Sequence, residues 1–541
     1  MLTYRVALMG SPVNYTVEWS DENLQYLKAL GFNTIQLNIA WGSRPGDEPL
    51  NMEDVVLTDE LDAETRAAVT HRQKQLQFRL AQCKKHGLRS IFHFGAPFNN
   101  KEGYYGLPLR RCTFDPETTA QCVQMLQMLH KQIPGIDDIL IYTFDQDAWQ
   151  CSEFIHCETC RGIPLHKRLT PFLHAMCDTW RAMNPQGILW WEPWEMSAGQ
   201  VYRIMELVPK ENFGLSLHSN IGEVQKTRPA DIWFCNTTRL AAARGIPVIA
   251  ELFLAEASEE TEPLLRVPCP QLTYSQIHTV MQVEGVVGVK EYYGLVPNNN
   301  DPCLEMAGQV FANETRCLSE CLQALAAPYG DYAEAMVAMW QLVSEAYLLF
   351  PWDVSWYARE IGKASLDHGW QSAFLRGKQA PSPSWESTRQ VVFMKTDNNE
   401  PNPYMCEDIG LRCEVAAEKF AEACAAASAL EAFMTGSAAT QMQEVSASLD
   451  YFRRVCVSYA LHLRETNVAN MLRESGMPYP AHLLAEMEAL LTQDAANQGL
   501  TGRVMESCKM FRQNPQVWLA IYLLLGEGEP RERGEFTLTT R

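Results

Sequence analysis

The sequence predicts an α/β fold, a (β/α)8 TIM barrel followed by an α-helical C-terminal region. Three observations predict it. Short apolar runs alternate with stretches of helical spacing over about the first 300 residues, which is typical of parallel strands joined by helices. There are eight such runs, the number that closes a barrel of this type. After residue 300 the short runs stop, whereas apolar residues at three- and four-residue spacing continue, which indicates helices alone.

The expected strands are short and rich in β-branched and aromatic residues, and polar or aromatic clusters follow them. They cover residues 5–10, 34–40, 90–95, 139–144, 188–192, 214–218, 248–253 and 286–291. A ninth run at 231–234 is either an accessory strand or the sixth strand in place of 214–218. A doubly wound open sheet is the weaker alternative, because no G-x-G-x-x-G follows the first strand.

Helices are expected wherever apolar residues recur at helical spacing. In the barrel these stretches are 22–30, 64–86, 116–131, 166–182 and 198–207, and beyond it they are 304–326, 331–348, 415–434, 442–464 and 481–492. Breaks rich in Pro, Ser and Asn at 379–384 and 396–403 divide the second half. We therefore expect a catalytic barrel at 1–300, a helical region at 301–525 and a flexible tail at 526–541.

Composition and charge exclude several classes of function. Hydrophobic residues make up 47% of the 541 residues and charged residues 20%, which is ordinary for a folded protein. The net charge of −20 repels phosphate backbones and anionic lipid surfaces, so neither nucleic acid nor membrane is an expected partner. No apolar run approaches the roughly 20 residues that span a bilayer. Residues 1–10 fit a first strand better than a secretory signal.

The cysteines indicate a reducing compartment. There are 17 of them, an odd number without regular spacing, which does not fit a disulfide framework. Some lie within apolar helical patterns, as Cys424 does, where a thiol serves as a small core residue. We therefore expect a cytoplasmic protein.

Charged and aromatic residues recur where the expected strands end, which is where barrels of this type carry their reactive groups. They are Trp41, His93, Asp145, Asp147, Glu192, Trp194, His218, Glu251, Lys290, Glu291 and Tyr292. Hydrolysis of a glycosidic bond needs one carboxylic acid that protonates the leaving oxygen and a second carboxylate that acts as nucleophile or base. Aromatic faces give a sugar ring an apolar platform. The pattern therefore favours a carbohydrate site, although any single carboxylate can instead be a loop cap or an ion-pair partner.

The hypothesis assigns roles to these residues. Either Asp145 or Asp147 is the proton donor, and either Glu251 or Glu291 is the nucleophile or base. Substrate-binding residues are Trp41, His93, Glu192, Trp194, His218 and Tyr292. No cofactor is required for this two-carboxylate chemistry.

Three motifs carry a resemblance to a known class of enzymes. FDQDAW follows the fourth strand, WWEPWE lies at the fifth and KEYYG at the eighth. With the helical second half, they resemble glycoside hydrolases, above all the beta-hexosaminidase-like barrels and the bacterial alpha-glucuronidases. Hexosaminidases have an adjacent Asp-Glu pair after strand four, where this chain has Asp145-Gln146-Asp147. The large two-carboxylate clan has Asn-Glu at strand four, which is missing here, and a strand-seven glutamate, which Glu251 matches. The resemblance therefore implies a reaction class, and leaves the mechanism open.

The expected function is a glycosidase that acts on small saccharides or glycosides, since polymers do not enter the cytoplasm. One alternative is a non-catalytic carbohydrate-binding barrel. Another is a lyase that forms a Schiff base with Lys290, although a lysine at this position more often pairs with a carboxylate. The apolar helices of the second half offer a surface for a homodimer.

A separate cluster has the spacing of metal ligands. Cys151, Cys157 and Cys160 lie within ten residues directly after the fourth strand, and two thiolates separated by two residues suit a tetrahedral metal. Cys112, in the loop after the neighbouring third strand, is a better fourth ligand than His156. The sequence predicts either a structural zinc site or a set of packed thiols.

Overall fold

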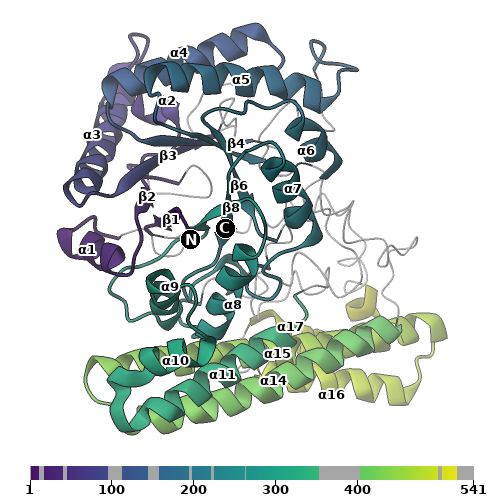
Figure 1. Ribbon diagram of the computed structural model, residues 1–541. Helices are drawn as coiled ribbons and strands as arrows, with labels where there is room; N and C mark the ends of the chain where they lie inside the picture. The colour runs from purple at the N-terminus through teal and green to yellow at the C-terminus, as the bar shows by residue number, and fades with distance from the viewer. Residues whose placement is uncertain are drawn as a thin grey trace.

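The computed structural model describes residues 2–10, 17–39, 46–95, 112–143, 151, 157–193, 196, 198–220, 224–261, 264–352, 403–497 and 502–520. Eight parallel strands form a closed barrel in sequence order (Figure 1). They are β1 (Tyr4–Leu8), β2 (Thr34–Gln36), β3 (Arg89–Gly95), β4 (Asp138–Thr143), β5 (Leu189–Pro193), β6 (Phe213–His218), β7 (Val248–Leu252) and β8 (Val286–Glu291). The predicted barrel is confirmed, and each of the eight predicted strands overlaps an observed one.

The ninth strand candidate is wrong. Residues 231–234 begin helix α7 (Ile232–Ala242), and the Asp231 carboxylate accepts a hydrogen bond of 2.8 Å from the Phe234 amide. An aspartate in this position satisfies one of the free N–H groups of the first turn. This cap outweighs the strand-like composition of the run, and residues 213–218 form the sixth strand.

The helices of the barrel shell cover the outer face of the strands (Figure 1). They are α1 (Asp21–Ala29), α2 (Met52–Val55), α3 (Ala63–Lys85), α4 (Pro116–Gln132), α5 (Leu165–Met183), α6 (Ala198–Met205), α7, α8 (Pro270–Met281) and α9 (Pro302–Ala312). Helix α9 completes the eighth unit: the Tyr26 hydroxyl of α1 donates to Glu305 at 2.5 Å, and the Phe311 ring lies 5.2 Å from that of Phe32. The barrel shell therefore continues past residue 300.

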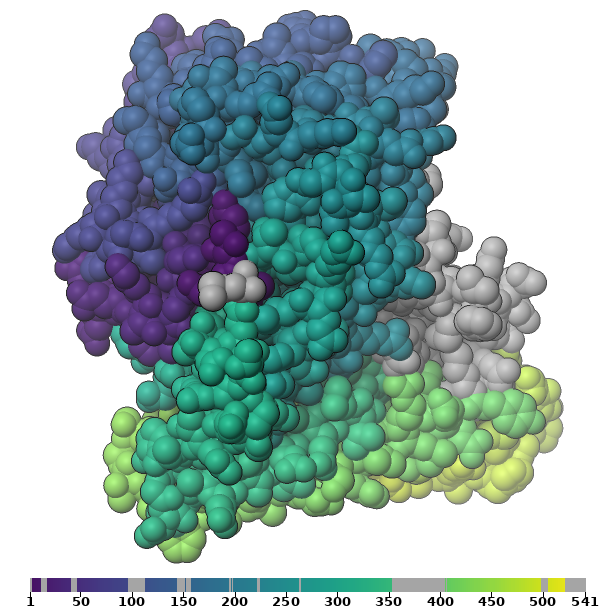
Figure 2. Space-filling view, viewed as in Figure 1, coloured from purple at the N-terminus to yellow at the C-terminus, as the bar shows by residue number. Residues whose placement is uncertain are grey.

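The predicted helical C-terminal region is confirmed. It consists of α10 (Leu318–Ala326), α11 (Ala333–Leu349), α14 (Pro403–Glu431), α15 (Ser437–Ser475), α16 (Ala481–Asn497) and α17 (Gly502–Gln513). These helices form a layer along one flank of the barrel, drawn in green and yellow in Figure 2. One apolar cluster joins the two parts, because Val267 and Leu272 of the barrel side pack with Trp340, Tyr347 and Phe452.

Two details of this region differ from the prediction. The single helix expected at 304–326 is two helices, α9 and α10. The chain turns between them, where the Asn313 side chain accepts from the amide and hydroxyl of Thr315 at 3.0 and 2.8 Å, a local bond that competes with a continuous helix. Helix α17 was not predicted. The break at 379–384, most of the break at 396–403 and the expected tail lie outside the described residues.

Among the described residues, no helix combines the length and the apolar character that a bilayer crossing requires.

The barrel interior has an apolar layer beneath a polar one. Val6, Ile91, Leu140, Trp190 and Ile249 form the apolar layer. Because strand side chains alternate between the two faces, the residue two positions further along faces the same interior, closer to the carboxyl ends of the strands. Those residues on β3, β4, β5 and β7 are His93, Tyr142, Glu192 and Glu251. The polar layer thus lies at the end of the barrel where active sites of this fold are found.

Gly214 of β6 leaves no room for a side chain in the apolar layer. A Cβ at this position would lie 2.3 Å from Cζ3 of the Trp190 ring, which is fully buried. We expect Gly214→Ala to lower the free energy of unfolding by about 1–3 kcal/mol, the range for an overpacked core, as measured by urea denaturation. Gly199→Ala is the matched control, since a Cβ there meets nothing within 4 Å and alanine favours helix α6. Equal stabilities of the two variants would contradict this packing.

Candidate active site

Two glutamates from strands β5 and β7 meet in the polar layer of the barrel. A carboxylate oxygen of Glu192, one of Glu251 and a ring nitrogen of His218 all lie within 4.8 Å of one another. The register brings them together, because His218 of β6 pairs with Glu251, which in turn pairs with Lys290 of β8. Each of the four side chains is almost completely buried.

Glu251 is surrounded by donors. Its Oε1 atom accepts from the Ser216 hydroxyl at 2.6 Å and from the Lys290 ammonium at 2.7 Å, and its Oε2 atom lies 2.9 Å from His218 Nε2. Burial alone would raise the pKa of this carboxyl, but the charges of Lys290 and His218 outweigh burial and hold the pKa well below its usual range. Glu251 is therefore an ionised carboxylate at neutral pH.

Glu192 has looser contacts. Its oxygens lie 3.7 Å from His218 Nε2, 3.8 Å from His93 Nε2 and 3.9 Å from Lys290 Nζ. Among the described residues its buried Oε2 atom has no hydrogen-bond partner. Burial, and after it the negative charge of Glu251, raises the pKa of Glu192. The two carboxyl groups therefore differ in their affinity for a proton, as acid and base partners must.

The two histidines have opposite charge preferences. Burial and the positive charge of Lys290 lower the pKa of His93 well below its usual value, and the Gln36 side-chain amide lies 3.3 Å from its Nδ1 atom. Burial would lower the pKa of His218 as well, but Glu251 and Glu192 outweigh burial and raise it. His93 is therefore neutral and His218 favours the cationic form, which balances one of the two carboxylates.

The structure brings together five of the predicted side chains. Four of them, His93, Glu192, His218 and Glu251, form the contacts described above, and the Tyr292 ring packs 4.0 Å from the His218 ring. Four other predicted residues, Trp41, Asp145, Asp147 and Trp194, lie outside the described residues.

Glu291, the second predicted nucleophile or base, does not belong to the group that Glu192 and Glu251 form. Its carboxylate accepts hydrogen bonds of 2.7–3.3 Å from the backbone amides of Leu254, Ala255, Tyr293 and Gly294. These bonds connect the ends of β7 and β8. In this geometry Glu291 positions the backbone around the site.

The prediction missed three contributors. Ser216 donates to Glu251, while Gln36 and Gln225 contact the Nδ1 atoms of His93 and His218 at 3.3 Å each. A signal was present for Ser216, because it stands two residues before His218 on the same strand and thus faces the same interior. Gln36 stands within the second predicted strand, where a buried amide needs a partner.

Lys290 pairs with carboxylates, which the sequence analysis gives as the more common role of a lysine at this position. Its Nζ atom lies between Glu251 and Glu192, at 2.7 and 3.9 Å. The lysine thus serves as the counter-ion of the two acids. This also bears on metal binding: Glu192, His218 and Glu251 have the spacing of metal ligands, but the ammonium group already occupies the cation position beside Glu251.

Comparisons with known proteins show similarity of fold. Neither the protein-family models nor the curated proteins give a match to this chain. Among solved structures, a GH138 enzyme targeting pectin rhamnogalacturonan II has a TM-score of 0.60 at 12% sequence identity, over 92% of this chain and 61% of that one. This chain thus spans about three fifths of that protein's length.

Two weaker matches are also glycoside hydrolases by their names. CpGH84B has a TM-score of 0.40 at 10% identity, over 92% of this chain and 74% of its own. A Bacteroidetes-affiliated GH5 cellulase has a TM-score of 0.37 at 14% identity, over 57% of this chain and 87% of its own. In fold, this barrel with its helical region is similar to that of the GH138 glycoside hydrolase, as the sequence motifs imply.

Proposed function

We propose that this protein is a glycoside hydrolase that cleaves small saccharides or glycosides with Glu192 as acid/base and Glu251 as nucleophile. One observation carries the proposal: a carboxylate oxygen of Glu192 lies within 4.8 Å of one of Glu251, and the pKa values of the two groups are shifted in opposite directions. Such a short separation suits a retaining mechanism, for which about 5–5.5 Å is typical, better than an inverting one, which needs room for a water molecule.

The reaction has two steps. In the first, protonated Glu192 donates its proton to the glycosidic oxygen, and the Glu251 carboxylate attacks the anomeric carbon, which forms a glycosyl ester and releases the alcohol. In the second, Glu192 takes a proton from water, which attacks the anomeric carbon and returns Glu251 to its ionised form. Lys290 and His218 keep Glu251 ionised between turnovers, and neutral His93 contacts a hydroxyl group of the substrate.

This assignment differs from the role predicted for Asp145 and Asp147. Either aspartate remains a candidate proton donor, with Trp41 and Trp194 as candidate sugar platforms. Because the similar GH138 enzyme is named for a pectic substrate, uronic-acid glycosides belong among the substrates tested. Small glycosides are also the substrates that suit the proposed cytoplasmic location.

A panel of chromogenic aryl glycosides, uronides and pectic oligosaccharides tests the proposal on the full chain. We expect turnover of at least one member, and the first product seen by NMR should retain the anomeric configuration. Glu192→Ala should keep most of its kcat/KM, which reports the first step, on substrates whose leaving group is an acidic phenol, and should lose much more of it on alkyl glycosides that need a proton donor. Glu305→Gln is the matched control, because Glu305 lies on helix α9, where Tyr26 is its partner.

Several outcomes would contradict the proposal. Inversion of configuration excludes Glu251 as a nucleophile. If Asp145→Asn or Asp147→Asn shows the leaving-group dependence that Glu192→Ala lacks, the donor is an aspartate. Binding of a sugar without turnover by any member of the panel supports the non-catalytic alternative.

The pH dependence of kcat/KM follows from the shifted pKa values of Glu192 and Glu251. The acid must be protonated, so activity should fall as pH rises through the raised pKa of Glu192. The nucleophile must be ionised, so activity should fall at acidic pH only as the lowered pKa of Glu251 is approached. We expect a broad bell. On a substrate with an acidic phenol, Glu192→Ala should lose the alkaline limb, and an unchanged alkaline limb would assign it to another group.

A further inference from the structure

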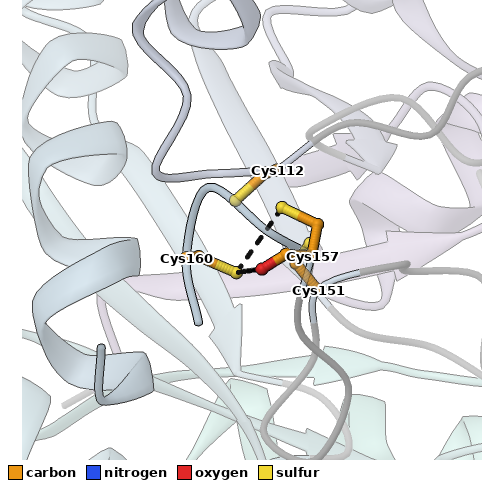
Figure 3. A group of neighbouring side chains, drawn as sticks. All are labelled: Cys112, Cys151, Cys157 and Cys160. Atoms are coloured by element: carbon orange, nitrogen blue, oxygen red, sulfur yellow. Dashed lines mark hydrogen bonds between the residues drawn. The ribbon is translucent and has the colours of Figure 1, made fainter. Parts of the chain in front are cut away.

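Four cysteines that are not part of the candidate active site face one another (Figure 3). Cys112 precedes helix α4, Cys151 follows strand β4, and Cys157 and Cys160 lie in the turn that leads into α5. All four sulfur atoms lie within 4.8 Å of one another. The structure thus assembles the complete set that the sequence predicts, including Cys112 from a separate segment.

The spacing of the sulfurs suits a tetrahedral metal. The sulfurs of Cys157 and Cys160 are 3.8 Å apart. Zn–S bonds of about 2.3 Å in tetrahedral geometry place two sulfurs about 3.8 Å apart. A disulfide needs about 2.05 Å, and all four cysteines are free.

The surroundings suit thiolates. The Cys160 amide donates to the Cys157 carbonyl oxygen at 3.2 Å, which closes the turn that carries both thiols. The buried Arg168 guanidinium donates to the Cys160 sulfur at 3.5 Å and to the Cys151 carbonyl oxygen at 3.2 Å. N–H groups of this kind are the usual outer partners of metal ligands. A zinc ion with four thiolates has a net charge of −2, which the arginine partly balances.

Thiols that only fill space in an apolar core have different neighbours from the four clustered cysteines. Cys456 in the helical region illustrates them, since it lies in a large apolar cluster with Leu449 and Phe452. By contrast, the cluster formed by the four cysteines includes one other apolar side chain among the described residues, that of Phe114. Sulfurs that face one another beside a buried cation are better explained by a shared ligand than by apolar packing.

We propose that Cys112, Cys151, Cys157 and Cys160 bind one structural Zn²⁺ ion. Four protein ligands leave no open coordination position, so the ion takes no part in hydrolysis. It ties the segments that precede α4 and follow β4 to the beginning of α5. Because residues 144–150 connect β4 to Cys151, the ion anchors the far end of the segment that contains Asp145 and Asp147. This proposal does not depend on the proposed function.

Metal analysis of the full, untagged chain tests the site. Protein produced with zinc in the medium should contain about one zinc per chain. After removal of zinc by a chelator, Co²⁺ should restore the metal content and give the visible absorption of a tetrahedral thiolate complex. Both measurements use the unaltered protein, so neither depends on a variant that folds.

Variants locate the metal. Cys157→Ser/Cys160→Ser should reduce the zinc content at least about tenfold, since two thiolate ligands are lost. The double variant Cys235→Ser/Cys317→Ser, at cysteines outside the cluster, should keep it. If the first variant does not fold, Cys157→His provides a second test: it keeps four ligands, so Co²⁺ should still bind, with a weaker thiolate charge-transfer band.

Two results would overturn the proposal. One is a folded, unaltered chain that contains no zinc and does not bind Co²⁺ after reduction of its thiols. The other is zinc that persists in Cys157→Ser/Cys160→Ser. If that zinc is lost in His462→Ala, the metal belongs instead to the buried group of His462, Glu465 and Asp494 in the helical region.

Discussion

Replacement of Glu251 with glutamine is expected to lower kcat/KM by about 10³-fold or more, the scale on which essential acid–base and nucleophilic groups act. Glutamine keeps the shape of the side chain but cannot form the glycosyl ester. It also leaves Lys290 and His218 without the anion that they contact at 2.7 and 2.9 Å. Steady-state kinetics on a substrate from the glycoside panel measures the loss, normalised to the folded fraction from circular dichroism.

A covalent intermediate distinguishes a nucleophile from a positioning residue. In the Glu192→Ala background the glycosyl ester should accumulate, because no base activates the water of the second step. Mass spectrometry of the digested protein should then find the sugar on the peptide that contains Glu251. A label on the peptide of Asp145, Asp147 or Glu291 would reject the assignment. It would also be rejected if Glu251→Gln were as active as the control variant Glu305→Gln.

The sequence alone indicates the architecture because that information is local. Eight apolar runs with helical stretches between them predict a closed barrel, and the residues at the ends of those runs include Glu192, His218, Glu251 and Lys290. The alternation of strand side chains also predicts that Glu192 stands above Trp190 and Glu251 above Ile249. The sequence therefore predicts most of the residues that form the polar layer.

The contacts within the layer depend on register, which the sequence does not reveal. The pairing of β7 with β8 shifts between Val248 and Ile249. Val248 pairs with Val286 and Ile249 with Gly288, so Val287 has no partner on β7. Without that bulge, Ile249, which faces the interior, would pair with Val287. Alternation along β8 from Val287 would then point Glu291 inward. With it, Lys290 faces Glu251, and Glu291 binds the backbone amides at the strand ends. One inserted residue thus decides which of two adjacent charged side chains enters the site.

Replacement of Lys290 with methionine is expected to lower the free energy of unfolding by a large amount. Methionine matches the length of lysine and suits a site that is 1% exposed, but it leaves Glu251 buried without its nearest cation. Removal of one partner from a buried ion pair costs about 3–5 kcal/mol. We expect a loss of this size in the free energy of unfolding at neutral pH, measured by urea denaturation.

The pH dependence of that loss gives a sharper test. In the unaltered protein the pKa of Glu251 is lowered, so the stability that this group contributes is present above its unfolded pKa of about 4.3 and is lost as pH falls through the folded value. Without Lys290 the folded pKa rises, and a protonated Glu251 is cheaper to bury. The stability difference between the two proteins should therefore be largest at neutral pH and shrink toward pH 4, while the acidic limb of kcat/KM moves to higher pH. Lys85→Met is the matched control, because the Lys85–Asp21 pair is exposed and such pairs contribute little.

Lys290→Arg separates the counter-ion role from Schiff-base chemistry. Arginine keeps a positive charge beside Glu251 but has no amine that condenses with a carbonyl group. As a counter-ion, Lys290→Arg should keep a measurable fraction of glycosidase activity and an acidic limb close to that of the unaltered protein, whereas Lys290→Met should not. Complete loss in both variants, together with trapping of a substrate on Lys290 by borohydride, would instead establish the lyase.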